Sequence, residues 1–172
     1  MKSTDSNETI KTLKTVSLFK DIKKTEDLKK IATILSHKHA TKGDFVIKEG
    51  DEGDTLYIMK EGSVQILKRT LENEEYTIVN LSSTKKMCFF FGELALLDND
   101  KRSATIIANT DCDFYIMKRK DFETLGDKQP TIGLKITREI SKILAGRLRK
   151  ANADIITLFE ALVSEVSEGS LE

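Results

Sequence analysis

The spacing of apolar residues along the chain changes twice. Up to about residue 36 they recur every three or four positions, as at Leu28, Ile31 and Leu35, which is the period of an α-helix. They then gather in short runs rich in β-branched and aromatic residues, which is typical of strands, before the helical period returns. The pattern predicts an N-terminal helical segment, a β domain, a hinge with a long helix, and a short tail, with the boundaries 1–36, 37–118, 119–168 and 169–172.

Turn residues separate the short runs of the β domain. Glycine stands beside aspartate, glutamate or serine in residues 42–44, 49–54 and 61–63. Glycine supplies the positive φ that tight turns require, and aspartate bonds the local backbone. The turn at 61–63 divides the run Leu56–Met59 from the run Val64–Lys68, so each run is expected to form a strand of its own. Many short strands at close spacing predict an antiparallel sandwich or jelly roll.

The last part of the chain has the pattern of a long helix. Gly126 is expected to end a short helix that begins near Asp121, and Pro130 suits the first turn of the next helix. Apolar residues then follow one another at spacings of 4, 3, 4, 3 and 4, the a/d pattern of a coiled coil: Leu144, Leu148, Ala151, Ile155, Leu158 and Leu162. One amphipathic helix lying on its own domain is the alternative. Because the stripe runs further than one small sandwich covers, we expect a parallel homodimer.

Composition narrows the class of protein. The 172 residues carry 28 Lys and Arg against 28 Asp and Glu, so the formal net charge is zero. A nucleic-acid binder usually carries a basic excess, so nucleic acid is not expected among the partners. The sequence also has no apolar run long enough for a membrane span and no apolar N-terminal core, so we expect neither a membrane partner nor a signal peptide.

The two cysteines favour a reducing compartment, and the two histidines do not indicate a metal site. Cys88 and Cys112 are far apart and lack Cys-x-x-Cys spacing, so a cytoplasmic location with reduced thiols is the default expectation. His37 and His39 stand two positions apart, but no further ligand types gather beside them. No metal is therefore expected.

One stretch combines a carboxylate and a guanidinium at short spacing. Residues 91–105 read FGELALLDNDKRSAT, in which Arg102 follows Glu93 by nine positions. Gly92 and Glu93 are expected to open a short helical turn, whose free N–H groups and partial positive charge suit an anion. Arg102 offers a planar fork that binds phosphate bidentately, and Ser103 adds a hydroxyl and an N–H group. An ionised carboxylate only accepts hydrogen bonds, so Glu93 suits a sugar hydroxyl.

Two interpretations of this stretch stay open. The residues fit a ligand that carries one anionic phosphate beside one ribose hydroxyl. Alternatively, Glu93 and Arg102 pair with each other in an empty site. Catalysis is not expected in either case, because no base stands beside a nucleophile and Glu93 has no evident acid partner. The protein is therefore not expected to be an enzyme or to need a cofactor.

Two stretches resemble the cyclic nucleotide-binding domain family. They are residues 43–67, with the sequence GDFVIKEGDEGDTLYIMKEGSVQIL, and residues 91–105, which resemble the family's phosphate-binding cassette. In this cassette Gly-Glu, eight residues, Arg, one residue and Ala follow one another. The resemblance covers roughly residues 17–160. It implies a mainly β fold, an antiparallel jelly roll of about eight strands with N-terminal helices and a long C-terminal helix.

The resemblance also implies the roles of the site residues. Glu93 would take the ribose 2′-hydroxyl and Arg102 the cyclic phosphate. Backbone N–H groups of the turn at 92–95 and of the two residues after the arginine would complete the phosphate shell. The expected ligand-binding residues are Gly92, Glu93, Leu94, Ala95, Arg102, Ser103, Ala104 and Asn152.

Asn152 and Ser103 bear on which nucleotide is bound. A serine directly after the cassette arginine is able to bond the N2 group of guanine. The same Arg-Ser-Ala sequence, however, resembles bacterial cyclic AMP receptors, in which polar residues of the long helix reach the adenine amino group, and Asn152 stands at a matching position. We therefore expect cyclic AMP, with cyclic GMP as the alternative. The family pattern is broken at Cys88-Phe89, where a Gly-Asp turn is usual, so the strand that enters the site is expected to run differently.

These observations predict a stand-alone cyclic nucleotide sensor for signal transduction. The chain ends at Glu172 without a helix-turn-helix segment, so the regulatory output is expected to pass from the C-terminal helix to a protein effector. Two alternatives remain. One is an interaction scaffold that binds no nucleotide because a pair between Glu93 and Arg102 closes its site. The other is the sensor half of a truncated DNA-binding regulator.

Overall fold

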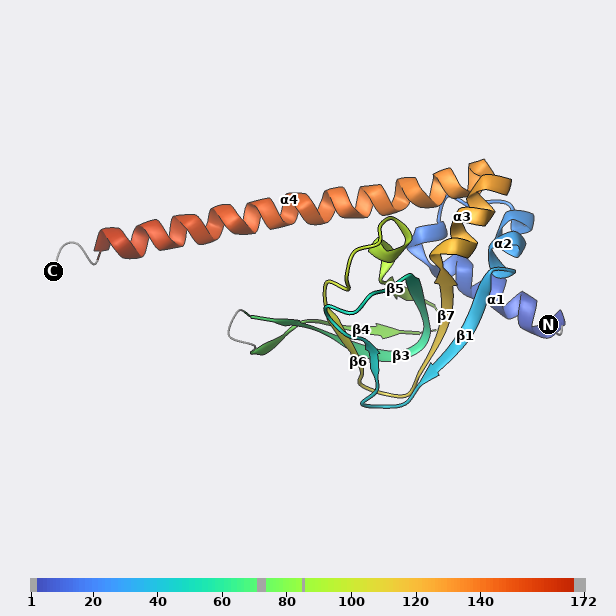
Figure 1. Ribbon diagram of the computed structural model, residues 1–172, viewed down its shortest axis with the longest axis horizontal. Helices are drawn as coiled ribbons and strands as arrows, with labels where there is room; N and C mark the ends of the chain where they lie inside the picture. Colours follow the sequence, from blue (N-terminus) through green and yellow to red (C-terminus); the bar gives the residue numbers. More distant parts are fainter. Residues whose placement is uncertain (1–2, 71–73, 85, 169–172) are drawn as a thin grey trace. The chain divides into compact units, whose positions relative to one another are not determined.

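The computed structural model describes residues 3–70, 74–84 and 86–168 (Figure 1). The chain folds into two compact units, Met1–Ile136 and Thr137–Glu172. The expected tail at 169–172 lies outside the described residues. Among the described residues, no helix is both long and apolar enough to cross a membrane.

Short helices form the N-terminal part of the first unit. They are α1 (Ser3–Thr15), the 3₁₀ helix η1 (Ser17–Phe19) and α2 (Thr25–Ala32). They pack through fully buried apolar side chains, which include Leu13, Leu18, Phe19, Leu28 and Ile31. The helical pattern ends earlier than expected, because the first strand already begins at Leu35.

The helix α1 is tied to the β domain by two polar contacts. The hydroxyl of Thr9 donates to the hydroxyl of Tyr115 at 3.2 Å, inside the packed interface. The ammonium of Lys60 lies 2.8 Å from the carboxylate of Glu8. The helix therefore forms part of the same unit as the strands.

Seven antiparallel strands form the β domain within the described residues. They are β1 (Leu35–Ala40), β2 (Phe45–Ile47), β3 (Thr55–Arg69), β4 (Glu75–Ser83), β5 (Phe89–Phe91), β6 (Thr105–Ala108) and β7 (Cys112–Lys118). Their order is β1-β7-β3-β6-β2, and β4 and β5 also pair with β3. The predicted fold is confirmed: a mainly β, curled antiparallel jelly roll with N-terminal helices and a long C-terminal helix (Figure 1).

The long strand β3 replaces two of the expected strands. Its first half pairs with β7 and β5, and its second half pairs with β4 and β6. The expected turn at 61–63 is instead a bend within β3, where Gly62 has a φ of 107° and the register shifts between Met59 and Glu61. A Cβ on Gly62 would lie 2.6 Å from Cys112 Sγ, so this position needs glycine. The prediction of two strands was wrong because the bend does not interrupt the ladder.

An aromatic cluster fills the core of the β domain next to the site. Tyr57 on β3 stacks on Phe91 of β5 with ring centroids 5.4 Å apart and an interplanar angle of 14°. Phe114 on β7 meets both rings edge-on, at 5.8 Å and 5.9 Å. Such edge and offset contacts stabilise beyond the burial of area alone. The cluster holds the ring of Tyr57 in one place.

Two helices follow the strands, α3 (Arg119–Lys128) and α4 (Pro130–Glu168). Gly126 does not end the first helix as expected, because α3 continues to Lys128. Its lack of a side chain serves packing instead: a Cβ on Gly133 of α4 would lie 2.9 Å from Gly126 Cα. The two glycines therefore let the helices approach closely.

Most of the predicted coiled-coil stripe is exposed in the second unit. Leu148, Ile155, Leu158 and Leu162 of α4 are 63%, 62%, 70% and 59% exposed. A soluble helix normally buries such a stripe against another element. The pairing of α4 with a second copy stays a prediction.

Candidate functional site

The predicted cassette begins where β5 meets a short helical turn. Gly92 follows the strand with a φ of 74°, in the left-handed region that favours glycine, and caps the 3₁₀ helix η2 (Glu93–Leu96). The side chains of Glu93 and Ala95 are buried, and Leu94 is half-buried. The backbone therefore turns sharply at Gly92 and carries the Glu93 carboxylate into the interior.

The backbone of Arg102 is held against the turn before β3. The N–H group of Gly50 donates to the carbonyl of Arg102 at 2.9 Å, and the N–H group of Arg102 donates to the carbonyl of Asp51 at 2.8 Å. Lys101 and Glu52 form an isolated antiparallel bridge beside these bonds. The turn at 49–54, which the sequence presents as one of its Gly-Asp turns, thus positions the arginine.

Two glycines make room for the guanidinium of Arg102. A Cβ on Gly53 would lie 1.9 Å from Arg102 Nε, and a Cβ on Gly92 would lie 2.9 Å from Arg102 Nη1. The guanidinium also lies over the ring of Tyr57, with Cζ 5.9 Å from the centroid, within the range of a cation–π contact. The structure therefore brings the two ends of the cassette, Gly92 and Arg102, into contact.

Arg102 is half-buried, and its guanidinium forms no ion pair with a carboxylate of the described residues. Burial lowers the pKa of its guanidinium, because desolvation disfavours the charged form, while Tyr57 and Asp54 act in the opposite direction. Arginine stays protonated in proteins, so the positive charge remains. Within the part of the chain that the structure describes, no ion pair to Arg102 is formed, whether with Glu93 or with another carboxylate. Arg102 thus keeps its hydrogen-bonding fork available to an anion.

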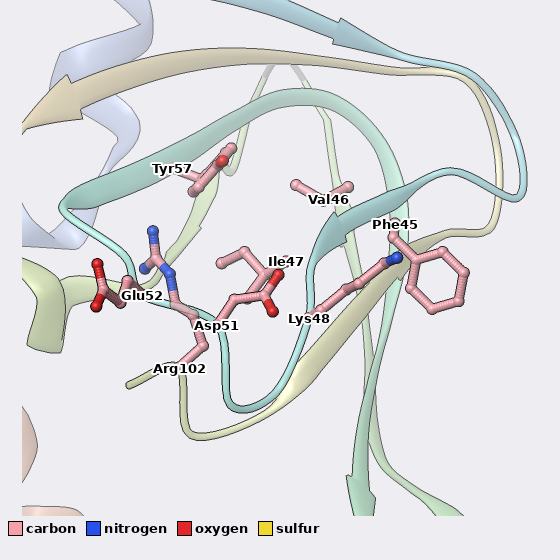
Figure 2. A pocket seen from close by; sticks show the side chains of 8 residues that line it. All are labelled: Phe45, Val46, Ile47, Lys48, Asp51, Glu52, Tyr57 and Arg102. Atoms are coloured by element: carbon pink, nitrogen blue, oxygen red, sulfur yellow. The ribbon is translucent and has the colours of Figure 1, made fainter. Parts of the chain in front are cut away.

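A hollow of about 230 Å³ lies beside this guanidinium (Figure 2). Figure 2 shows the Arg102 side chain reaching toward Tyr57, with Ile47 nearby and the carboxylates of Asp51 and Glu52 on either side of its stem. The full lining is Phe45, Val46, Ile47, Lys48, Asp51, Glu52, Tyr57 and Arg102. Four of these eight residues are charged, two cations and two anions, and the other four form an apolar and aromatic wall.

The other predicted residues occupy different positions. Of the eight, all of which the structure describes, Arg102 alone lines this hollow. Ser103 is exposed and Ala104 half-buried, directly after the arginine. Asn152 is exposed and belongs to α4 in the second unit, so its contact with a ligand stays a prediction.

Sequence reasoning identified none of the other seven residues that line the hollow as a site residue, nor Gly53. Tyr57 and Gly53 are the two of them that lie against the guanidinium. Tyr57 lies among apolar strand residues, so the sequence alone did not distinguish it from the core. Gly53 belongs to a turn that was predicted, but its close approach to Arg102 depends on a residue 49 positions later. The strand that follows Cys88, β5, pairs with β3, and its Phe91 stacks on Tyr57. That this strand runs differently from the family pattern stays a prediction.

Fold and site together define a jelly roll in which a half-buried arginine lines a hollow. The family model of the cyclic nucleotide-binding domain matches residues 37–129, more than half of the 172 residues. The chain belongs to this family, whose domain is a regulatory, nucleotide-binding one.

Individual relatives cover the same region. Human cGMP-dependent protein kinase 2 is 32% identical over 144 residues, which are 83% of this chain and 17% of the kinase. The type II regulatory subunit of cAMP-dependent protein kinase from Drosophila melanogaster is 28% identical over 156 residues, 91% of this chain and 39% of the subunit.

A solved structure supports the fold. The catabolite activator protein of Thermus thermophilus superposes with a TM-score of 0.72 at 26% identity, covering 82% of this chain and 62% of that chain. The chain thus spans less than two thirds of each of these three relatives.

Proposed function

We propose that the chain is a cyclic nucleotide sensor whose preferred ligand is cyclic AMP and whose signal passes to a protein partner through α4. One observation carries the proposal: a half-buried guanidinium without an ion-pair partner among the described residues, at the edge of a hollow in a cyclic nucleotide-binding fold. A buried charge is costly unless an opposite charge meets it. A ligand phosphate supplies that charge.

Different residues of the cassette bind different groups of the ligand. Arg102 binds the cyclic phosphate through its planar fork, which matches phosphate geometry bidentately. Glu93, buried at the start of η2, accepts from the ribose 2′-hydroxyl. Backbone N–H groups of residues 92–95, Ser103 and Ala104 complete the phosphate shell. The arrangement recognises a phosphate and a hydroxyl on one small molecule.

The preference for cyclic AMP rests on Asn152 and on the Arg102-Ser103-Ala104 sequence. Asn152 carries both a donor and an acceptor, which suits the adenine amino group. The two kinase relatives are named for different nucleotides, so their names do not decide the preference. Measuring the affinities for cyclic AMP and cyclic GMP decides whether Asn152 contacts the base.

Isothermal titration calorimetry of the purified chain is expected to give saturable binding of both nucleotides, with cyclic AMP bound more tightly. The Asn152→Ala variant should narrow the difference between the two ligands, because it removes the group that reads the base. Adenosine has the same base and ribose but no phosphate, and is expected to bind far more weakly. At about 1 mM nucleotide, even a binding free energy near −4 kcal/mol is detected. The absence of both heat and thermal shift at this concentration of either nucleotide would rule out the proposal.

The scaffold alternative requires Arg102 to be closed off by Glu93. The absence of an ion pair to Arg102 among the described residues does not favour that alternative. Binding that depends on the phosphate, as opposed to the base alone, would distinguish the sensor from the scaffold.

The output of the sensor is proposed to involve a dimer of α4. The exposed stripe that includes Leu148, Ile155, Leu158 and Leu162 has the spacing of a coiled coil. We expect sedimentation analysis to give a dimer, and Leu158→Asp to give a monomer, because a charge at a buried seam is left without a partner. Thr157→Asp, the same change at the neighbouring exposed position outside the stripe, serves as the control. A monomer at high protein concentration would contradict the dimer without bearing on nucleotide binding.

A further inference from the structure

The peptide between Ser103 and Ala104 carries two polar groups that are fixed to each other. A trans peptide is planar, so its C=O and N–H groups point in opposite directions, and the described residues contain no cis peptide. Holding the carbonyl of Ser103 therefore also orients the N–H group of Ala104. In the proposed function this N–H group is one of the donors to the cyclic phosphate.

No regular ladder orients this peptide. The β3–β6 ladder runs from Val64 and Ala108 to Leu67 and Thr105, where β6 begins. The next position would pair Lys68 with Ala104, but residues 102–104 lie outside any helix or strand. The peptide thus stands one step beyond the end of the ladder.

The side chain of Lys68 takes the place of the missing backbone bond. Its ammonium donates to the carbonyl of Ser103 at 3.2 Å. The side chain is 45% exposed, so it reaches the loop over the surface of the sheet without being part of the core. It joins the strand to the loop at the position where the ladder stops.

Glu49 holds the lysine in this position. One carboxylate oxygen of Glu49 lies 3.8 Å from the Lys68 ammonium, and the other accepts from the N–H group of Arg69 at 3.1 Å. The N–H group of Glu49 itself donates to the hydroxyl of Thr105 at 3.1 Å. Glu49 therefore connects β3, the turn before it and the start of β6 around the same peptide.

We propose that Lys68 is a positioning residue of the nucleotide site, which acts by fixing the Ser103–Ala104 peptide so that the Ala104 N–H group is oriented before the ligand arrives. The inference rests on the proposed function, because it assigns a cause to the geometry of a phosphate donor. Groups that are held in place before binding cost less ordering when the ligand binds. Lys68 itself does not touch the nucleotide in this arrangement.

The test compares Lys68→Met with the unaltered protein. Methionine keeps much of the apolar stem and removes the donor, and we expect cyclic AMP affinity to fall by about 10- to 150-fold, the range for one hydrogen bond to a charged group. Lys68→Arg keeps a donor and a charge and should restore most of the affinity. Lys42→Met makes the same charge change at an exposed turn position and should bind like the unaltered protein.

A spectroscopic readout separates positioning from stability. In the ligand-free protein, the amide resonance of Ala104 should shift in Lys68→Met and stay unchanged in Lys42→Met. The affinity loss should also persist at about 0.5 M salt, where charge effects through solvent are screened within a few ångströms. A merely structural role would lower the unfolding temperature without moving this resonance selectively.

The outcomes are distinguishable. If the unaltered protein binds neither nucleotide, the proposed function is overturned and this inference with it. If it binds cyclic AMP and Lys68→Met binds equally tightly, only the role of Lys68 is overturned. If the affinity loss disappears at high salt, or Lys68→Arg fails to restore binding while remaining folded, the lysine does not act by fixing the peptide.

Discussion

Arg102→Ala is expected to weaken cyclic nucleotide binding by roughly 2–5 kcal/mol, the range for truncating one partner of a desolvated charge pair. The guanidinium is half-buried and forms no ion pair within the described residues, so a bound phosphate would be its charge partner. The loss corresponds to roughly 30- to several-thousand-fold in dissociation constant. Calorimetry, or competition against a fluorescent nucleotide, measures it directly.

Two further variants separate the fork from the charge. Arg102→Lys keeps a positive charge but loses the planar bidentate fork, so its affinity should lie between those of the unaltered protein and Arg102→Ala. Lys42→Ala removes a charge at an exposed turn and should leave binding unchanged. An Arg102→Ala protein that is folded and binds as tightly as the unaltered one would refute the role assigned to Arg102.

Gly53→Ala is expected to abolish most of the binding while leaving the protein folded. The added Cβ would lie 1.9 Å from Arg102 Nε and 2.3 Å from Arg102 Cζ. These atoms belong to the end of a flexible side chain, so the guanidinium moves away from Gly53 and the backbone does not. We expect the free energy of unfolding to change by less than about 1 kcal/mol, as for alanine in a compatible backbone position. Calorimetry and thermal unfolding of the same sample measure both quantities.

Gly43→Ala is the matched control for this variant. Gly43 has a φ of 91° and no atom within 4 Å of an added Cβ, so alanine there strains the backbone without touching Arg102. It should lower stability by about 1 kcal/mol and leave binding intact. The double variant Gly53→Ala with Arg102→Ala should bind no more weakly than Arg102→Ala alone, because both changes remove the same contact. Full additivity would show that Gly53 acts by another route.

The position of Arg102 depends on contacts that are distant in the chain. Its backbone is held by the turn at 49–54 and its side chain lies against Gly53, Gly92 and Tyr57. The sequence presents these residues as a turn, a cassette glycine and a strand residue. Only the pairing of strands brings these residues together around Arg102. The surroundings of the guanidinium were therefore not predictable from the local sequence pattern.

The bend at residues 61–63 also depends on contacts that are distant in the chain. Residues 61–63 contain the turn chemistry of a glycine beside polar residues, and that chemistry predicted two strands. The ladders on both sides of Gly62 instead continue through a register shift, so β3 serves both halves of the roll. Gly126 was misjudged for a similar reason, since the glycine faces Gly133 of the next helix.

The sequence by itself determined the class of the fold, the family and the two charged residues of the cassette. The period of the apolar residues, the turn residues and the spacing from Glu93 to Arg102 are local properties of the sequence, which do not depend on tertiary contacts. The tertiary structure decided that the Tyr57 ring, Gly53 and Gly92 surround the guanidinium of Arg102. It also decided that this guanidinium forms no ion pair among the described residues. These depend on strand register and burial, which arise only when segments far apart in the chain pack together.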